Sequence, residues 1–116
     1  MEFSTALKKN YDFRRAYRKG RSAAEPCLVV YARRNNTARE NRVGYTVSNK
    51  LGCAVVRNRV RRRLREIYRL NEQRFRPGYD IVVVARGRSV PADYQRLERE
   101  FMRACAGLGL LKEAQD

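Results

Sequence analysis

Seven arginines lie between residues 57 and 69, and their guanidinium groups are the side chains of this sequence best suited to binding a polyanion. Their positions are Arg57, Arg59, Arg61, Arg62, Arg63, Arg65 and Arg69, and the only acid among them is Glu66. A guanidinium can donate two parallel hydrogen bonds to a phosphate and can stack on a base. Like charges four residues apart destabilise a helix by roughly 0.2–0.5 kcal/mol per pair unless an anion neutralises them. The cluster therefore favours a polyanion-binding surface over a solvated face, where charges of both signs usually mix.

Residues 53 to 70 are predicted to form the helix that positions these arginines. Val56, Val60, Leu64 and Ile67 recur at steps of three and four residues, which places them in one apolar stripe. Cys53 lies beside this stripe and Tyr68 on its border. The residues that point the other way are Asn58, Arg61, Arg62, Arg65 and Arg69.

Few side chains of the sequence suit acid–base, nucleophilic or metal chemistry. There is no histidine, and the twelve carboxylates are scattered rather than paired. Cys27, Cys53 and Cys105 are widely spaced within apolar patterns, so we expect small core residues in a reducing compartment and no zinc site. The sequence therefore predicts no catalytic and no metal-binding residue in the protein itself.

The charge balance favours an anionic macromolecular partner. The 116 residues carry 27 Lys and Arg against 12 Asp and Glu, a formal charge of +15, which favours nucleic acid or an anionic membrane surface. No apolar run approaches the about 20 residues that span a bilayer. The first residues also lack the apolar core of a signal peptide. We expect one domain over residues 1–116 in a soluble, cytoplasmic protein.

A second helix is predicted over residues 10–20, with Asn10 as its N-cap and Gly20 at its end. Phe13, Ala16 and Tyr17 share one face of this helix. Aromatic residues at helical spacing usually belong to a core, but the arginines around these two also make base stacking possible. Both interpretations stay open on the sequence alone.

The remaining segments predict an α+β fold, an α/β sandwich in the order α-β-β-α-β-α. Two strands, 27–34 and 42–48, are expected to be joined by a hairpin loop at 35–41. A third strand at 80–86 is apolar at successive positions, as in a strand covered on both faces. A crossover through the arginine helix makes strands 42–48 and 80–86 parallel. The last helix follows Pro91, with its apolar face at Tyr94, Leu97, Phe101, Ala104, Cys105 and Leu108, and a loose tail is expected at 110–116.

The segment from Arg42 to Glu66 resembles the signature of the bacterial ribonuclease P protein subunit. It reads RVGYTVSNK, then a short glycine turn, then RNRVRRR at the start of the basic helix. Residues 7–13 (LKKNYDF) are similar to the opening of that family, and residues 79–86 (YDIVVVAR) to its later strand. The similarity covers residues 7 to 105 in the expected order and spacing.

The resemblance implies a ribosomal protein S5 domain 2-like fold with a left-handed β-α-β crossover. It also implies an endoribonuclease made of protein and RNA, in which the protein joins a catalytic RNA and removes the 5′ leader of precursor tRNA. The expected partners are the ribonuclease P RNA subunit and precursor tRNA, without membrane or DNA. The RNA subunit is expected to carry the chemistry and to require Mg²⁺, with no cofactor held by the protein.

Site residues follow from the resemblance position by position. The residues expected to bind the catalytic RNA are Arg57, Asn58, Arg59, Arg61, Arg62 and Arg65, and Arg69 extends the same face. Phe13, Tyr17 and Tyr31 match aromatic positions that line a cleft for the single-stranded leader, where stacking accepts any base. Ser48 and Lys50 border this cleft and are expected to contact phosphate.

Three positions depart from the family pattern, and two other functions fit the composition. Asn49 stands where a lysine is common, Cys53 where asparagine often caps the helix, and Arg63 where many relatives carry leucine, so Arg63 is expected to extend outward along its stem. A non-catalytic ribosomal or general RNA-binding protein has a similar composition. A membrane-surface amphipathic helix is the third reading, although its apolar stripe would be needed to cover the sheet.

Overall fold

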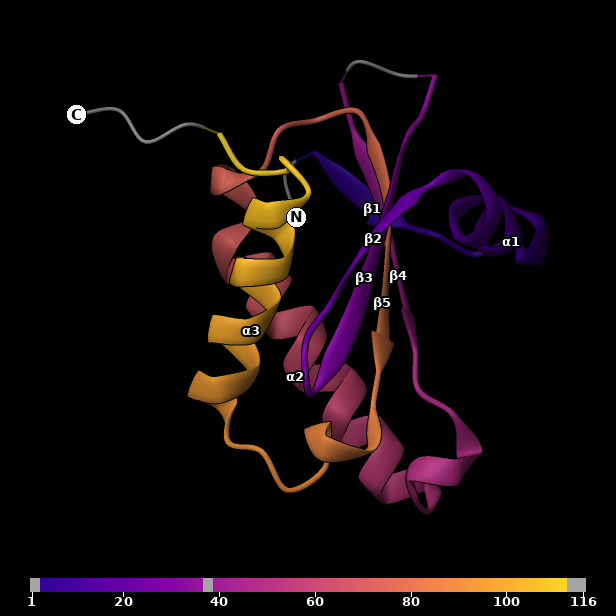
Figure 1. Ribbon diagram of the computed structural model, residues 1–116. Helices are drawn as coiled ribbons and strands as arrows, with labels where there is room; N and C mark the ends of the chain where they lie inside the picture. Colours follow the sequence, from indigo (N-terminus) through magenta and orange to yellow (C-terminus); the bar gives the residue numbers. More distant parts are fainter. Residues whose placement is uncertain (1–2, 37–38, 113–116) are drawn as a thin grey trace.

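A five-stranded sheet in the order β1-β4-β5-β3-β2 separates helix α1 from helices α2 and α3. Figure 1 shows the sheet edge-on, with α1 on one face and α2 and α3 on the other. The computed structural model describes residues 3–36 and 39–112. The elements in chain order are β1 (Ser4–Ala6), α1 (Asn10–Lys19), β2 (Arg21–Ala24), β3 (Leu28–Arg34), β4 (Asn41–Thr46), the 3₁₀ helix η1 (Asn49–Leu51), α2 (Ala54–Asn71), η2 (Glu72–Arg74), β5 (Tyr79–Ala85), η3 (Gly87–Ser89) and α3 (Tyr94–Gly107).

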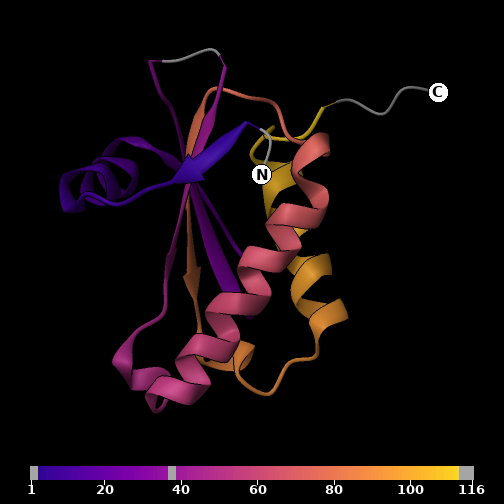
Figure 2. The ribbon, with the colours of Figure 1, turned by 180° about the vertical axis from the view of Figure 1, so that it is seen from behind.

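Strand β5 is the centre of the sheet. It pairs parallel with β4 and antiparallel with β3, and its residues from Asp80 to Val83 are buried, which confirms the strand predicted to be covered on both faces. The parallel pairing also confirms the predicted crossover through α2. In Figure 2 the chain descends β4, rises along α2 and descends β5, which with this strand order makes the crossover left-handed, as the resemblance implies.

The predicted hairpin between strands 27–34 and 42–48 is wrong. Strands β3 and β4 are not neighbours, because β5 lies between them. The connecting segment instead bonds to the turn before β5: Asn35 donates its N–H to the Gly78 carbonyl, and Gly78 donates its N–H to the Glu40 carbonyl. Strands β4 and β3 instead cover the two edges of β5. Part of the predicted loop, residues 37–38, lies outside the described residues.

Two strands were missed at the edges of the sheet. β1 and β2 are rich in Ser, Thr and Ala, so neither shows the alternation of apolar and polar residues that predicts a strand. They form because β4 and β3 offer pairing edges: Ser4 pairs with Asn41, and Arg21 with Ala32. β1 covers β4 only up to Val43, which leaves the end of β4 without a neighbour on that edge.

Two apolar layers hold the helices to the sheet. The larger lies under α2 and α3, where Val60, Leu64 and Ile67 of the predicted stripe are buried together with Leu97 and Phe101. The smaller lies under α1 and contains the buried residues Leu7, Ala16 and Val82, with Phe13, Tyr31 and Val84 against them. The helices α1, α2 and α3 thus confirm the predicted periodicity.

The start of α1 and the burial of one cysteine differ from prediction. Lys9, not Asn10, is the N-cap of α1, and it makes no side-chain capping bond. Cys27 and Cys105 are buried as expected, but Cys53 is exposed, since it precedes the first turn of α2, where the chain is exposed from Gly52 to Val55.

The first residues of the expected loose tail, 110–112, are packed against the rest of the protein. Leu110 is fully buried and donates its N–H to the Cys105 carbonyl (3.0 Å). Lys112 donates to the Arg74 carbonyl (2.8 Å), and Leu111 forms a β-bridge with Phe75. The end of the described chain therefore packs against the segment after α2, while residues 113–116 lie outside the described residues. Within residues 3–36 and 39–112, none of the helices is long and apolar enough to cross a membrane.

Candidate nucleic-acid interface

An aromatic cleft opens between α1 and the uncovered end of β4. Its main cavity, about 570 Å³, is lined by Asn10, Phe13, Arg14, Tyr17, Tyr45, Thr46, Val47 and Arg61. A smaller hollow of about 200 Å³ shares Phe13, Tyr45 and Arg61 with it and adds Arg65. Because β1 stops at Val43, α1 on one face of the sheet and the arginines of α2 on the other meet across the free edge of β4. The cleft thus combines aromatic walls with a cationic side.

Gly44 allows the ring of Phe13 to lie against β4. A Cβ at position 44 would lie 2.5 Å from Cζ of Phe13, closer than such atoms approach, and 3.2 Å from Cβ of Leu7, a tight contact. Phe13 is half-buried, packs on the small apolar layer under α1 and also lines the cleft. The core interpretation of this residue is therefore confirmed, and base stacking in the cleft stays a prediction.

Tyr17 and Tyr31 form an edge-to-face pair, with ring centroids 4.9 Å apart and an interplanar angle of 79°. The Tyr17 hydroxyl shares a hydrogen bond with Thr46 Oγ1 (3.1 Å), so that α1 is tied to β4 at the wall of the cleft. Tyr17 is 38% exposed and lines the cavity, whereas Tyr31 packs in the small apolar layer. Tyr31 thus supports Tyr17 rather than lining the cleft itself.

Tyr45 is a cleft residue that sequence reasoning missed. Its ring packs against the larger apolar layer, under α2 and α3. It also lines both hollows, because the edge of β4 is uncovered there. Its hydroxyl is buried and has no hydrogen-bond partner among the described residues, and burial raises its pKa well above the ordinary value. Tyr45 enters the cleft because β1 stops at Val43, and the sequence carried no signal of where β1 ends.

The exposed face of α2 carries three arginines without a partner among the described residues. Arg59, Arg62 and Arg65 are exposed, three residues apart, and make no hydrogen bond or ion pair there. We call these three the arginine row. At this spacing they lie along one side of the helix. A row of free guanidiniums is suited to successive phosphates of a nucleic acid backbone.

The other predicted RNA-binding residues of α2 have partners within the helix or just before it. Arg57 donates from Nε to the Gly52 carbonyl (3.1 Å), and Arg61 donates to Asn58 Oδ1 (3.1 Å). Arg69 donates from Nε to Glu66 Oε2 (3.0 Å), which lowers the pKa of the Glu66 carboxyl. Exposed ion pairs of this kind contribute little to stability. Arg69 could therefore reach an RNA only by sharing or leaving its carboxylate.

The departures from the family pattern each have a structural outcome. Arg63 is half-buried and donates to the Ala92 carbonyl (3.0 Å), so it ties α2 to the segment before α3 rather than extending into solvent. Cys53 is the N-cap of α2 without a capping hydrogen bond, and the nearby N–H groups of Val56 and Val55 lower the pKa of its thiol. Asn49 begins η1, where the Ser48 hydroxyl accepts a hydrogen bond from the Lys50 N–H (3.2 Å).

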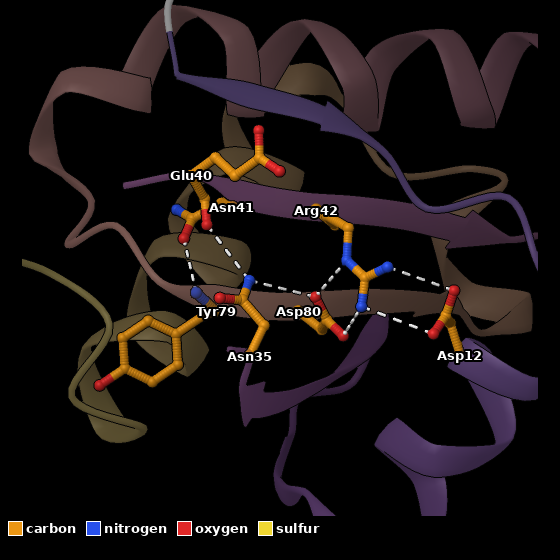
Figure 3. A network of polar contacts seen from close by, with 7 residues as sticks. All are labelled: Asp12, Asn35, Glu40, Asn41, Arg42, Tyr79 and Asp80. Carbon is orange, nitrogen blue, oxygen red and sulfur yellow. Dashed lines mark hydrogen bonds and ion pairs between the residues drawn. The ribbon is translucent and has the colours of Figure 1, made fainter. Parts of the chain in front are cut away.

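An ion-pair network holds α1 against the sheet (Figure 3). Arg42 of β4 donates from Nη2 to Asp80 Oδ2 (2.7 Å) and from Nη1 to Asp12 Oδ2 of α1 (3.3 Å). The carboxylates are buried, with side chains 2% (Asp80) and 4% (Asp12) exposed. These contacts, with Asp80 first, raise the pKa of Arg42. One guanidinium thus connects β4 to both β5 and α1.

Comparison with known proteins decides the family. The family model described as "Ribonuclease P" matches residues 1–109. The chain belongs to the ribonuclease P protein family. Relatives named "Ribonuclease P protein component" are 45% identical in Natranaerobius thermophilus, over 92% of this chain and 92% of that protein, and 41% identical in Alkaliphilus oremlandii, over 98% and 99%.

Solved structures of ribonuclease P proteins share the fold. The protein from Staphylococcus aureus superposes with a TM-score of 0.84 at 32% identity, covering 92% of this chain and 97% of that one. The protein from Thermotoga maritima gives a TM-score of 0.77 at 29% identity, covering 84% and 92%. The mixed α+β fold expected from the sequence is therefore that of ribonuclease P proteins.

In this ribonuclease P protein, the predicted site residues fall into two groups. Phe13, Tyr17 and Arg61 meet in the cleft, and Arg65 lines its smaller hollow. The predicted residues that line neither hollow are Tyr31, Ser48, Lys50, Arg57, Asn58, Arg59, Arg62 and Arg69. Ser48 and Lys50 are exposed in the turn that follows β4. Among residues 3–36 and 39–112, no three His, Cys, Asp or Glu side chains gather as metal ligands would.

Proposed function

We propose that this ribonuclease P protein binds the catalytic RNA subunit through α2 and the 5′ leader of precursor tRNA through the cleft between α1 and β4. The observation that carries the proposal is that Arg61 and Arg65 of α2 also line the aromatic cleft. Two surfaces of different chemistry therefore adjoin. A leader in the cleft would lie next to the RNA that α2 holds, which is where cleavage at the leader–tRNA junction requires it.

The arginine row supplies the electrostatic part of the mechanism. Phosphates of a folded RNA repel one another, and each protein cation that binds one releases a condensed counterion. The three free guanidiniums can take phosphates without first breaking a contact within the described protein. Asn58, which accepts from Arg61, keeps that side chain extended along the helix. The protein thereby reduces the magnesium concentration that the RNA needs to fold.

The cleft supplies substrate preference. Stacking on aromatic rings is tolerant of base identity, so a leader of varied sequence can bind beside Phe13 and Tyr17 while Arg14 and Arg61 contact its backbone. Mature tRNA lacks the leader and gains none of this affinity. The proposed effect is therefore tighter binding of precursor than of product.

Phosphodiester hydrolysis is assigned to the RNA subunit and its Mg²⁺. The chain has no histidine to act as general base, and Asp12 is bound to Arg42 beneath α1. The protein residues described above bind and orient RNA rather than move protons.

The proposed function predicts a gain in cleavage by the RNA subunit at low magnesium. Precursor tRNA is incubated with the RNA subunit, with and without the protein, and the rate and substrate affinity are measured. Both are expected to rise with the protein, while the protein alone is expected to leave the substrate intact. No gain, combined with equal binding to unrelated structured RNAs, would instead indicate a general RNA-binding protein.

Phe13→Leu is predicted to weaken the preference for precursor over mature tRNA. Leucine keeps an apolar side chain against Gly44 but removes the ring, and stacking on one aromatic is worth about 1–3 kcal/mol per base, roughly 5- to 150-fold in affinity. The ratio of the dissociation constants of mature and precursor tRNA, measured with the holoenzyme, should therefore decrease by a factor in this range. Tyr79→Leu is the control, because this half-buried aromatic lies outside the cleft. An unchanged ratio in Phe13→Leu would return Phe13 to a purely packing role.

A further inference from the structure

The outer face of α1 carries a second basic surface, separate from α2. A hollow of about 320 Å³ is lined by Tyr11, Arg14, Arg15, Arg18 and Lys19, which we call the outer α1 patch. All five side chains are exposed, and Tyr11 is 48% exposed. The one acid of α1, Asp12, is buried and bound to Arg42 on the sheet side of the helix. The patch therefore presents cations with no carboxylate from its own helix.

The cations of the patch lack anionic partners in the described part of the chain. Arg14, Arg18 and Lys19 make no hydrogen bond or ion pair there, and Arg15 has only a ring contact. Arg14 and Arg18, and likewise Arg15 and Lys19, are like charges four residues apart, which repel on a helix. An anionic ligand would relieve this repulsion.

An aromatic ring lies among these cations. Arg15 Cζ is 5.4 Å and Lys9 Nζ 5.7 Å from the centroid of the Tyr11 ring. A half-exposed ring flanked by cations is the combination with which proteins bind single-stranded nucleic acids, since bases stack and phosphates pair. The patch thus has the chemistry of the cleft in a smaller hollow, about 320 Å³ against about 570 Å³.

Position relates the patch to the cleft rather than to α2. Arg14 lines both the cleft and the outer hollow, so the two adjoin across the crest of α1. Helix α2 lies on the opposite face of the sheet, as both views of the ribbon show. A strand leaving the cleft past Arg14 would enter the patch, whereas an RNA lying along the arginine row would be directed away from it.

We propose that the outer α1 patch binds the phosphate backbone of leader nucleotides upstream of those held in the cleft. This proposal rests on the proposed function of the cleft, and it adds a second binding site for single-stranded RNA on the same protein. The consequence is that affinity for precursor tRNA rises further once the leader is long enough to pass the crest of α1.

The test compares short and long leaders in the holoenzyme. Precursor tRNAs with leaders of about 4 and about 16 nucleotides, the range of single-stranded sites on small binding domains, are titrated with the wild-type protein and with an Arg15→Gln, Arg18→Gln, Lys19→Gln variant. Arg14 is left in place because it also lines the cleft. The variant is expected to lose the extra affinity of the long leader, and its salt slope on that substrate to fall by about 2. Its affinity for the short leader and for the RNA subunit should remain that of the wild type.

A control variant and the opposing outcomes distinguish this proposal from the proposed binding of the leader in the cleft. A triple variant with the same change of charge, Arg74→Gln, Arg88→Gln and Arg99→Gln, alters exposed arginines of η2, η3 and α3 and should retain the effect of leader length. Loss of RNA-subunit affinity in the α1 variant would assign the patch to that RNA, and an unchanged long-leader affinity would leave it as a solvated face; either result overturns the proposal. Failure of the cleft itself is detected separately, with Phe13→Leu on the short leader.

Discussion

Replacing Arg59, Arg62 and Arg65 together by glutamine is expected to weaken binding of the RNA subunit by roughly two orders of magnitude near physiological salt. Each phosphate contact adds about 0.9 to the slope of log affinity against log salt for a duplex, so the slope should fall by about 3. The loss is expected to be large because these guanidiniums have no partner among the described residues and are fully available to phosphates. The measurement is a series of binding curves between about 0.05 and 0.2 M salt.

Two controls distinguish contact with the row from the effect of total charge. The Arg74, Arg88 and Arg99 triple variant removes the same charge from other exposed positions and should change the slope little. Arg63→Gln changes an arginine of the same helix that bonds to the Ala92 carbonyl, so it should lower stability and leave the slope in place. Equal losses in both triple variants would mean that binding follows net charge alone, and the assignment of the arginine row would be lost.

The parts of the fold that the sequence predicted are those governed by local periodicity. The apolar stripe of α2 and the continuous apolar run of β5 are each determined within one segment, and both were confirmed. Strands β1 and β2 depend on edges offered by β4 and β3, and the order of β3, β5 and β4 depends on contacts distant in sequence. A single sequence carries little of that information, which is why the hairpin prediction was wrong.

In the candidate site, too, local features were predictable from the sequence and features that depend on neighbouring elements were not. An excess of arginine in one helix is visible in the sequence, but which guanidiniums are free is not: Arg63 is used for packing and Arg69 has Glu66, whereas Arg62 is unpartnered among described residues. The cleft depends on where β1 stops and on the absence of a side chain at Gly44. Both are properties of neighbouring elements rather than of α1 itself.

Arg42→Ala is expected to lower the free energy of unfolding by about 3–5 kcal/mol, because removal of one partner leaves buried charge uncompensated. Arg42 contacts two carboxylates, Asp80 and Asp12, which are 2% and 4% exposed, so its loss leaves both buried carboxylates without their cationic partner. Asn35 still donates to Asp80 Oδ1 (3.2 Å) and retains part of the network. With total stabilities of about 5–15 kcal/mol for small domains, this is a major part of the whole. Urea unfolding at neutral pH measures the change.

The large loss of stability expected in Arg42→Ala depends on buried carboxylates that lack a cationic partner, and matched variants test this cause. Arg34→Ala, at an exposed arginine of β3 with only a ring contact to Tyr79, should change stability by well under about 1 kcal/mol. Adding Asp12→Asn and Asp80→Asn to Arg42→Ala should recover part of the loss, since neutral amides are less expensive to bury than carboxylates. Asp12→Asn alone removes only the longer ion pair, 3.3 Å against 2.7 Å, and so should loosen α1 more than it destabilises the sheet. If Arg42 sets the width of the cleft, Asp12→Asn should weaken the preference for leader-bearing substrate while stability stays near normal. If Arg42→Ala lowers stability as little as Arg34→Ala does, the sheet and α1 hold together without Arg42.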